Sequence, residues 1–254
     1  DKVMVLQEGA TVSKGGVDPM RFVGPVTLQG SATLDGFGGE LEFTGPVGDT
    51  GFGGVTKIGG ATISLLGANT YIGGNTISNG TLKVSTQSAD NNTTVNSGAT
   101  LGAVVTSAGT TLTIPSLTLG SGGGNVELLF DLGTLGNPTA PVMQANFLTT
   151  NAATYEVTVE ADLENLTLTG GTPITLLKYP AGAFTNDVVA TLPAGMTGTV
   201  INNTAASEIQ LTITAVSRAL TWVGNESSDW DIDDSINWLN GILPTTYREL
   251  GAGD

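Results

Sequence analysis

The sequence predicts an all-β protein whose first half is a β-solenoid, that is, a chain wound into stacked coils of parallel strands. Short segments rich in Thr, Val, Ile and Leu alternate with glycine- or asparagine-containing turns along the whole chain. No window keeps a capped helical pattern for ten residues. A threonine followed by an aliphatic residue also recurs in the first half, and such periods are typical of repeat architectures.

The expected strands follow one another from the first residues to the last third of the chain. The clearest alternating segments are 26–34, 39–43, 61–65, 80–84, 110–119, 155–163 and 208–216. Alternation with period two and β-branched residues are typical of strands that bury one face. Glycine and asparagine between these segments favour tight turns, because both tolerate positive φ.

The threonine repeat separates a solenoid from a sandwich in residues 1–125. Its members are Thr11, Thr33, Thr62, Thr81 and Thr100, with steps of 22, 29, 19 and 19 residues. A sandwich has no reason to keep this spacing, whereas each coil of a solenoid covers the next. The glycine-rich segment 120–124 then predicts a flexible turn. Residues 126–216 form a second β-rich region, for which a sandwich and a continued solenoid are both open.

Residues 53–84 resemble the autotransporter-associated β-strand repeat of bacterial passenger domains. Lys57 and Gly59 match the entry of that motif, LLGANTYIGG at 65–74 matches its turn, and TISNGTLKV at 76–84 matches its closing strand. The sequence departs from the family pattern at Gly60-Ala61, where a Thr-Leu pair is usual. The resemblance implies a right-handed β-helix and an exported structural protein, outside the cell or on its surface.

The turn of this motif carries the residues expected to define the repeat, which are Asn69, Tyr71 and Gly73. We expect Tyr71 to pack over the flank of the solenoid. The alternative for Tyr71 is stacking on a sugar, as aromatic side chains present a large apolar face.

Residues 217–254 resemble a tryptophan-rich junction that leads from one repeat unit to the next in large bacterial surface proteins. The pattern W-x-G, W-D and N-W-x-x-G is met by LTWVGNESSDWDIDDSINWLNG at 220–241. In the family this junction continues into a G-D-x-V strand. The chain ends in GAGD and begins DKVMVL, so its end and its start together rebuild that strand. We therefore expect head-to-tail contact between copies, anchored by Trp222, Trp230, Trp238, Val3 and Val5.

Composition excludes several classes of function. The chain of 254 residues has no Cys and no His, which removes thiol chemistry, disulfides and every mechanism that needs an imidazole. Eight basic against 23 acidic residues give a net charge of −15, which repels nucleic acid and anionic lipid. No apolar run is long enough for direct membrane insertion. The opening DKVMVLQEG is typical of an interior or processed piece of a larger precursor.

Acidic residues offer two candidate chemistries, and neither is convincing. Asp229, Asp231 and Asp233 imitate the start of a calcium loop, but Asp234 replaces its glycine and Asn240 its final glutamate. A solvated acidic turn explains them better, and we expect no metal and no cofactor. Two pairs share a strand face and could serve a glycosidase, namely Glu40 with Glu42 and Glu160 with Asp162. Such pairs are common in β proteins, and we assign no catalytic residue.

We expect a structural subunit or repeat unit of an exported bacterial surface fibre, stalk or matrix, and not an enzyme. Its expected partners are copies of itself, joined head to tail through terminal strands. The alternative is an adhesin-type module that binds extracellular glycans or a surface. A β-helical polysaccharide-degrading enzyme comes third, because the basic residues that a lyase needs are few and scattered.

Overall fold

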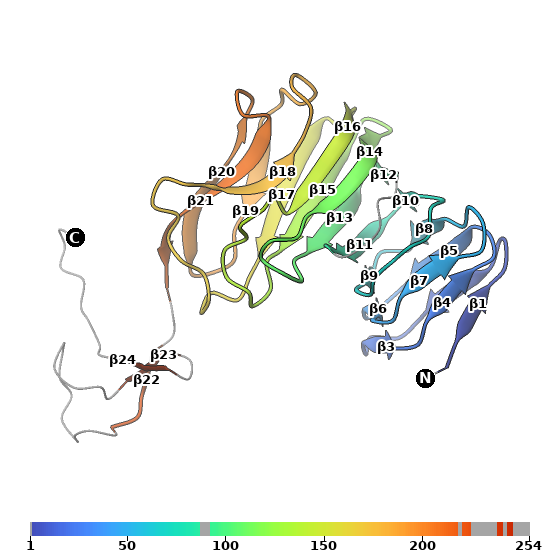
Figure 1. Cartoon of the computed structure of the whole chain (residues 1–254), viewed down its shortest axis with the longest axis horizontal. Helices are drawn as coiled ribbons and strands as arrows, with labels where there is room; N and C mark the ends of the chain where they lie inside the picture. Colours follow the sequence, from blue (N-terminus) through green and yellow to red (C-terminus); the bar gives the residue numbers. More distant parts are fainter. Residues whose placement is uncertain (1, 87–91, 218–219, 225–237, 241–242, 246–254) are drawn as a thin grey trace.

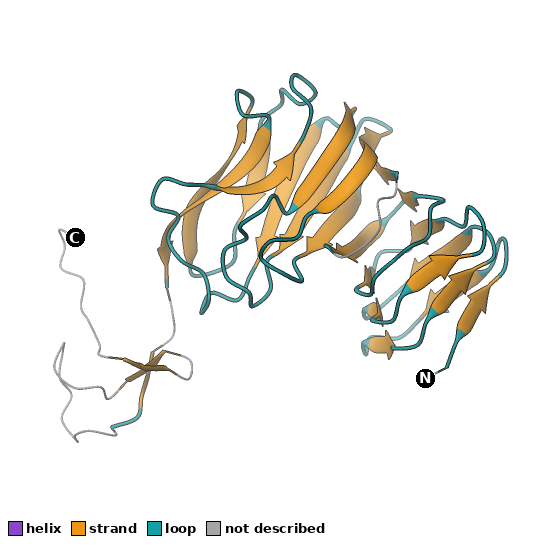
Figure 2. Ribbon diagram, in the orientation of Figure 1, coloured by secondary structure: helices purple, strands orange, loops and turns teal. Residues whose placement is uncertain are grey.

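The computed structural model describes residues 2–86, 92–217, 220–224, 238–240 and 243–245. Every regular element within these ranges is a β-strand (Figures 1 and 2), which confirms the predicted all-β class. The strands form two long sheets and two small ones.

The larger sheet has ten strands, and all neighbours from β2 to β18 are parallel. In spatial order they are β2 (Thr11–Lys14), β5 (Ala32–Gly36), β8 (Val55–Ile58), β10 (Asn75–Ile77), β12 (Thr93–Asn96), β14 (Leu112–Ser121), β16 (Met143–Thr150), β18 (Ile174–Lys178), β21 (Glu208–Val216) and β20 (Met196–Asn203). The last two are antiparallel additions, β21 on β18 and β20 on β21.

The second long sheet has eight strands and is parallel throughout. In spatial order they are β3 (Met20–Phe22), β6 (Leu41–Phe43), β9 (Thr62–Leu65), β11 (Gly80–Ser85), β13 (Ala99–Val104), β15 (Asn125–Asp131), β17 (Thr154–Glu160) and β19 (Val188–Thr191). Its pairing therefore runs from the first 125 residues into the next 66 without a break in the sheet.

The small sheets lie at the two ends of the sequence (Figure 1). A parallel one joins β1 (Met4–Leu6), β4 (Val26–Leu28) and β7 (Val47–Asp49). An antiparallel one joins β22 (Leu220–Trp222), β23 (Trp238–Asn240) and β24 (Leu243–Thr245). Up to β9 the chain visits the first small sheet, the ten-stranded sheet and the eight-stranded sheet in turn. From β10 to β19 it alternates between the two long sheets.

The register explains the uneven threonine repeat. Thr11 and Thr33 are neighbours in the ten-stranded sheet, whereas Thr62, Thr81 and Thr100 are neighbours in the eight-stranded sheet. The step of 29 residues is therefore a change of sheet. Within each sheet the repeat is regular, since threonine occupies equivalent positions on successive strands.

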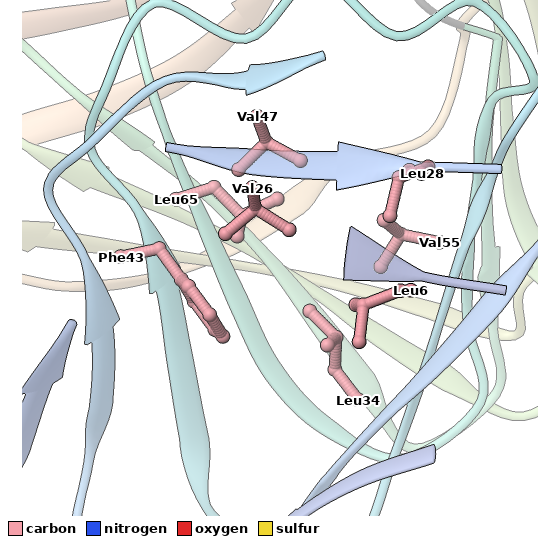
Figure 3. Close-up of a pocket in the computed structure, with 8 residues that line it drawn as sticks. All are labelled: Leu6, Val26, Leu28, Leu34, Phe43, Val47, Val55 and Leu65. Atoms are coloured by element: carbon pink, nitrogen blue, oxygen red, sulfur yellow. The ribbon is translucent and has the colours of Figure 1, made fainter. Parts of the chain in front are cut away.

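The core is filled by side chains from the facing sides of the sheets. Near β1, eight apolar side chains converge (Figure 3), namely Leu6, Val26, Leu28, Leu34, Phe43, Val47, Val55 and Leu65. The space between them is about 10 Å³, barely the size needed for one water molecule. This part of the interior therefore packs against itself and leaves no room for a ligand.

The turn at 65–74 is held by buried side chains as well as by backbone hydrogen bonds, such as that from the N–H of Thr70 to the carbonyl of Val47. Tyr71 is fully buried, and its hydroxyl donates a 2.6 Å hydrogen bond to Oδ1 of Asn75. The Asn69 side chain, 1% exposed, donates from Nδ2 to the carbonyl of Leu65. Gly73 lies so close to Phe52 that a Cβ would meet its carbonyl oxygen at 2.4 Å. The Tyr71 ring thus packs inside the fold and presents no face to a sugar.

Replacement of Tyr71 by phenylalanine tests this turn. The variant removes one buried hydroxyl and leaves Oδ1 of Asn75 without that donor. We expect the free energy of unfolding, measured by urea titration, to fall by about 1–3 kcal/mol. Ile72→Ala is the matched control, because Ile72 is 58% exposed and its truncation should change stability by less than ~0.5 kcal/mol. Equal effects of both variants would contradict this account of the turn.

Candidate functional site

The structure separates the residues expected at the head-to-tail junction. Val3 and Val5, in and beside β1, are 63% and 51% exposed. Trp222 in β22 is 41% exposed, and its backbone pairs with that of Trp238 in β23. Trp230 lies outside the described residues. Within one copy, Trp222 and Trp238 lie opposite each other on neighbouring strands. Among the described strands, β4 is the one that pairs with β1.

The acidic calcium-like turn, Asp229, Asp231, Asp233 and Asp234, also lies outside the described residues. Within the described ranges, no three Asp or Glu side chains are grouped so that they could hold a metal ion.

The carboxylate pairs considered for glycosidase chemistry are engaged by neighbours on their own sheet. Glu42 forms an ion pair with Arg21, and Glu40 accepts a hydrogen bond from the Ser64 hydroxyl. Glu160 is bound by a lysine, described next, and Asp162 caps the backbone N–H of Glu164. Each carboxylate therefore has a local partner that accounts for its position.

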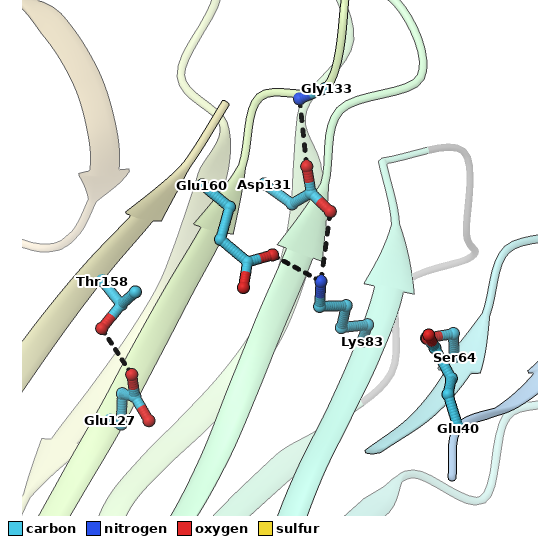
Figure 4. Close-up of polar contacts among 8 residues, drawn as sticks. All are labelled: Glu40, Ser64, Lys83, Glu127, Asp131, Gly133, Thr158 and Glu160. Carbon is cyan, nitrogen blue, oxygen red and sulfur yellow. Dashed lines mark hydrogen bonds and ion pairs between the residues drawn. The ribbon is translucent and has the colours of Figure 1, made fainter. Parts of the chain in front are cut away.

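A lysine crosses the outer face of the eight-stranded sheet (Figure 4). The ammonium of Lys83, on β11, lies 2.6 Å from Glu160 on β17 and 3.2 Å from Asp131 on β15. Its stem passes over Gly102 of β13, where a Cβ would meet Cγ of Lys83 at 2.9 Å. Burial lowers the pKa of Lys83, but hydrogen bonds and charge from Glu160 and Asp131 outweigh it and raise the pKa overall. The lysine thus ties four successive strands together.

Beside this ion pair, Glu127 sits between two threonine hydroxyls. Thr158 donates to its Oε1 at 2.5 Å, and Thr100 donates to its Oε2 at 2.8 Å (Figure 4 shows the first of these). Asn125, two residues before Glu127 on β15, donates to Glu156 on β17 at 3.2 Å. Thr100, Asn125, Glu127 and Glu156 line an open hollow of about 210 Å³. Both carboxylates of this hollow, Glu127 and Glu156, already accept hydrogen bonds from uncharged side chains.

The outer face of the ten-stranded sheet differs sharply, because it is free of exposed charge over strands β2 to β16. From β2 to β16 the only charged residues in its strands are Lys14, Asp35 and Lys57, and all three are buried. Seven threonines form one column across consecutive strands, namely Thr11, Thr33, Thr56, Thr76, Thr94, Thr118 and Thr149. Phe147, 73% exposed, lies at one end of this face. Sequence reasoning missed the column, because uneven loop lengths hide its period.

Lys57, the entry residue of the sequence motif, occupies a core position between Leu34 and Ile77. It is fully buried, and its ammonium donates to the carbonyls of Ile58 at 2.8 Å, Gly59 at 2.7 Å and Asn79 at 3.0 Å. Burial lowers the pKa of Lys57 to about 8, partly opposed by the charge of Asp35. The side chain therefore fastens the corner between the two long sheets.

Comparison with protein-family models, curated proteins and solved structures found no match to this chain. In the part of the chain that the structure describes, no helix has the length and apolar character to span a membrane. Functional assignment therefore rests on the chain's own residues and geometry.

Replacement of Lys57 by methionine should reveal the buried ammonium through pH. Between pH 8 and pH 10 the folded wild type releases a proton that the unfolded chain still holds, so stability should rise with pH. The methionine variant should lack this rise and, at pH 7, should lose about 1–3 kcal/mol because three carbonyls lose a donor. Urea titrations at several pH values measure both effects. If the free energy of unfolding changed with pH in the same way for both proteins, a buried ammonium at Lys57 with a lowered pKa would be contradicted.

Gly102→Val should break the crossing of Lys83, because the new side chain occupies the path of the lysine stem. We expect a loss of about 1–3 kcal/mol from crowding and the displaced ion pairs. In a Lys83→Ala background the same substitution should cost clearly less, since the crowded atoms are gone. Thermal or urea unfolding of the four proteins measures this coupling, and additive costs would disprove the contact.

Proposed function

We propose that this chain is a structural module of an exported bacterial surface fibre, stalk or matrix, folded as a right-handed β-solenoid. The orderly alternation of strands between sheets supports the solenoid, because each coil adds one strand to each long sheet. The likeness of residues 53–84 to the autotransporter-associated repeat supports the handedness, the export and a place outside the cell. The three sequence regions, 1–125, 126–216 and 217–254, are its coils, its closing region and its junction.

One observation carries the proposal: the apolar core is only partly covered at both ends of the stack. At the first coil, Met20 is 47% exposed and Phe22 half-buried, although both face the interior beside Leu41 and Phe43. At the other end the inward-facing Ala190 is exposed. Open strand edges with uncovered apolar side chains template pairing with another chain. A module of this kind carries load and sets distances through stacked copies, and it needs no catalytic cleft.

A second candidate function is favoured by the charge-free threonine face. Seven strands at ~4.8 Å spacing make a strip about 30 Å long. Its shortest strands, β2, β8, β10 and β12, have three or four residues and make it about 10–13 Å wide at its narrowest. The resulting 300–400 Å², roughly, is about half of what one partner buries in a standard protein interface. A narrow, uncharged strip of hydroxyls, with Phe147 at its end, suits a linear neutral glycan better than a folded protein.

Assembly is tested with the purified 254-residue chain in the absence of calcium. We expect filaments by negative-stain microscopy and a concentration-dependent ladder by size-exclusion chromatography with light scattering. Ile201→Lys, which places a charge on the exposed edge strand β20, should shorten or abolish the ladder. Phe147→Lys is the control, because Phe147 is even more exposed (73% against 51% for Ile201) but lies on an interior strand. A monomer at every concentration would refute the fibre role.

Glycan binding is tested by affinity electrophoresis in gels that contain hydroxyethyl cellulose or pullulan, two neutral polysaccharides. Retardation should be lost in Thr76→Lys and Thr94→Lys, which interrupt the threonine column. Thr81→Lys, on the outer face of the other long sheet, should be retarded like the wild type. Unchanged mobility of the wild type in both gels would eliminate this second candidate.

A further inference from the structure

The antiparallel hairpin at the end of the ten-stranded sheet restores the strand direction of its beginning. β21 runs against β18, and β20 runs against β21, so β20 points the same way as β18. Because every pair from β2 to β18 is parallel, β20 also points the same way as β2. In the eight-stranded sheet, β3 and β19 are parallel ends by the same reasoning.

We infer that β20 of one copy adds in parallel to β2 of a second copy, which continues the ten-stranded sheet across the junction. This inference rests on the proposed assembly and names the strands that perform it. Parallel addition gives each edge a partner for its unpaired N–H and C=O groups. The two contacting ends are unlike, so the contact propagates as a polar filament and does not close into a dimer.

The side chains at the two ends are suited to this junction. On the first coil, Val12 faces inward beside Leu34 and is half-buried, as Phe22 is beside Phe43. On the last strands, Val200 faces inward beside Leu211, while Val188 and Ala190 face inward from β19. Apposition of Val12 and Val200 would continue the apolar core across the junction, flanked by the inward-facing Lys14 on β2 and Asn202 on β20. Removing this apolar surface from water supplies the driving force.

Charge also favours contact between unlike ends. Residues 1–23 hold three basic residues, Lys2, Lys14 and Arg21, and three acidic ones, Asp1, Glu8 and Asp18, in a chain of net charge −15. Residues 180–217 hold two acidic residues, Asp187 and Glu208, and no basic one. Contact between two acidic ends would therefore be repulsive, whereas contact between the acidic and the neutral end is not.

The junction moves away from the residues that the sequence indicated. Val3 and Val5 belong to the edge of the three-stranded sheet, and that sheet ends at β7. Among the described residues, no strand of the C-terminal half belongs to it. The stacking contact is therefore carried by β2, while β1 flanks it.

The absence of cysteine allows a clean crosslinking test of this pairing. Thr11 or Ser13 on β2 is changed to cysteine in one set of full-length chains, and Thr199 or Ile201 on β20 in another. All four side chains are exposed. Neighbouring parallel strands bring Cα atoms to ~4.8 Å, which lies within the range that a disulfide spans. Thr76→Cys, exposed in part on an interior strand of the same sheet, is the control.

Under mild oxidation, at least one mixture of a β2 variant with a β20 variant should give a disulfide-linked dimer. Each variant alone, and Thr76→Cys mixed with either, should remain uncrosslinked. A chain carrying one cysteine in each strand should give a ladder of covalent multimers. If filaments form while no mixture crosslinks, or while each variant crosslinks only with itself, the assignment of β2 and β20 is wrong, but the fibre role stands. If neither filaments nor crosslinks form, the fibre role fails as well.

Discussion

The structure depends on parallel, in-register stacking, in which each strand is completed by its neighbours in the same sheet. Leu82, for example, has Ile63 on one side and Leu101 on the other, and the backbone of β11 bonds to both neighbours. Each interior strand thus relies on two neighbours of its own sheet. The first and last strands of each sheet have one neighbour, and this is why we propose assembly.

The corners between the sheets show how this stacking is kept in register. Strands supply their own backbone partners, whereas turns must find partners for their carbonyls. Lys57 donates to three such carbonyls from a position in the core, and the Tyr71–Asn75 bond fixes the next turn. On the outside, Lys83 reaches two carboxylates across strands that lie 48 and 77 residues further along the chain. Buried polar contacts at a few points thus hold the uniform apolar ladder in one register.

The sequence was sufficient for the all-β class and for part of the repeat. Alternating segments predicted strands correctly because each strand buries one face. Tyr71 was expected to pack over a flank, and the structure buries it inside the fold. The threonine series could not show that its members belong to two different sheets. Loops vary in length, so a step of 29 residues could equally be a longer loop within one sheet. The charge-free face and the Lys83 crossing depend on register, which no local pattern records. The handedness, the export and the role of Trp230 stay predictions.

Hydrogen exchange of assembled against monomeric protein tests the central claim most directly. Amides of edge strands exchange fast when they lack a partner and slowly when they pair. We predict that assembly newly protects β2 and β20, while the interior strands β8 to β15 keep their protection. Unchanged exchange at these two edges, or new protection confined to the threonine face, would contradict stacking through open sheet edges.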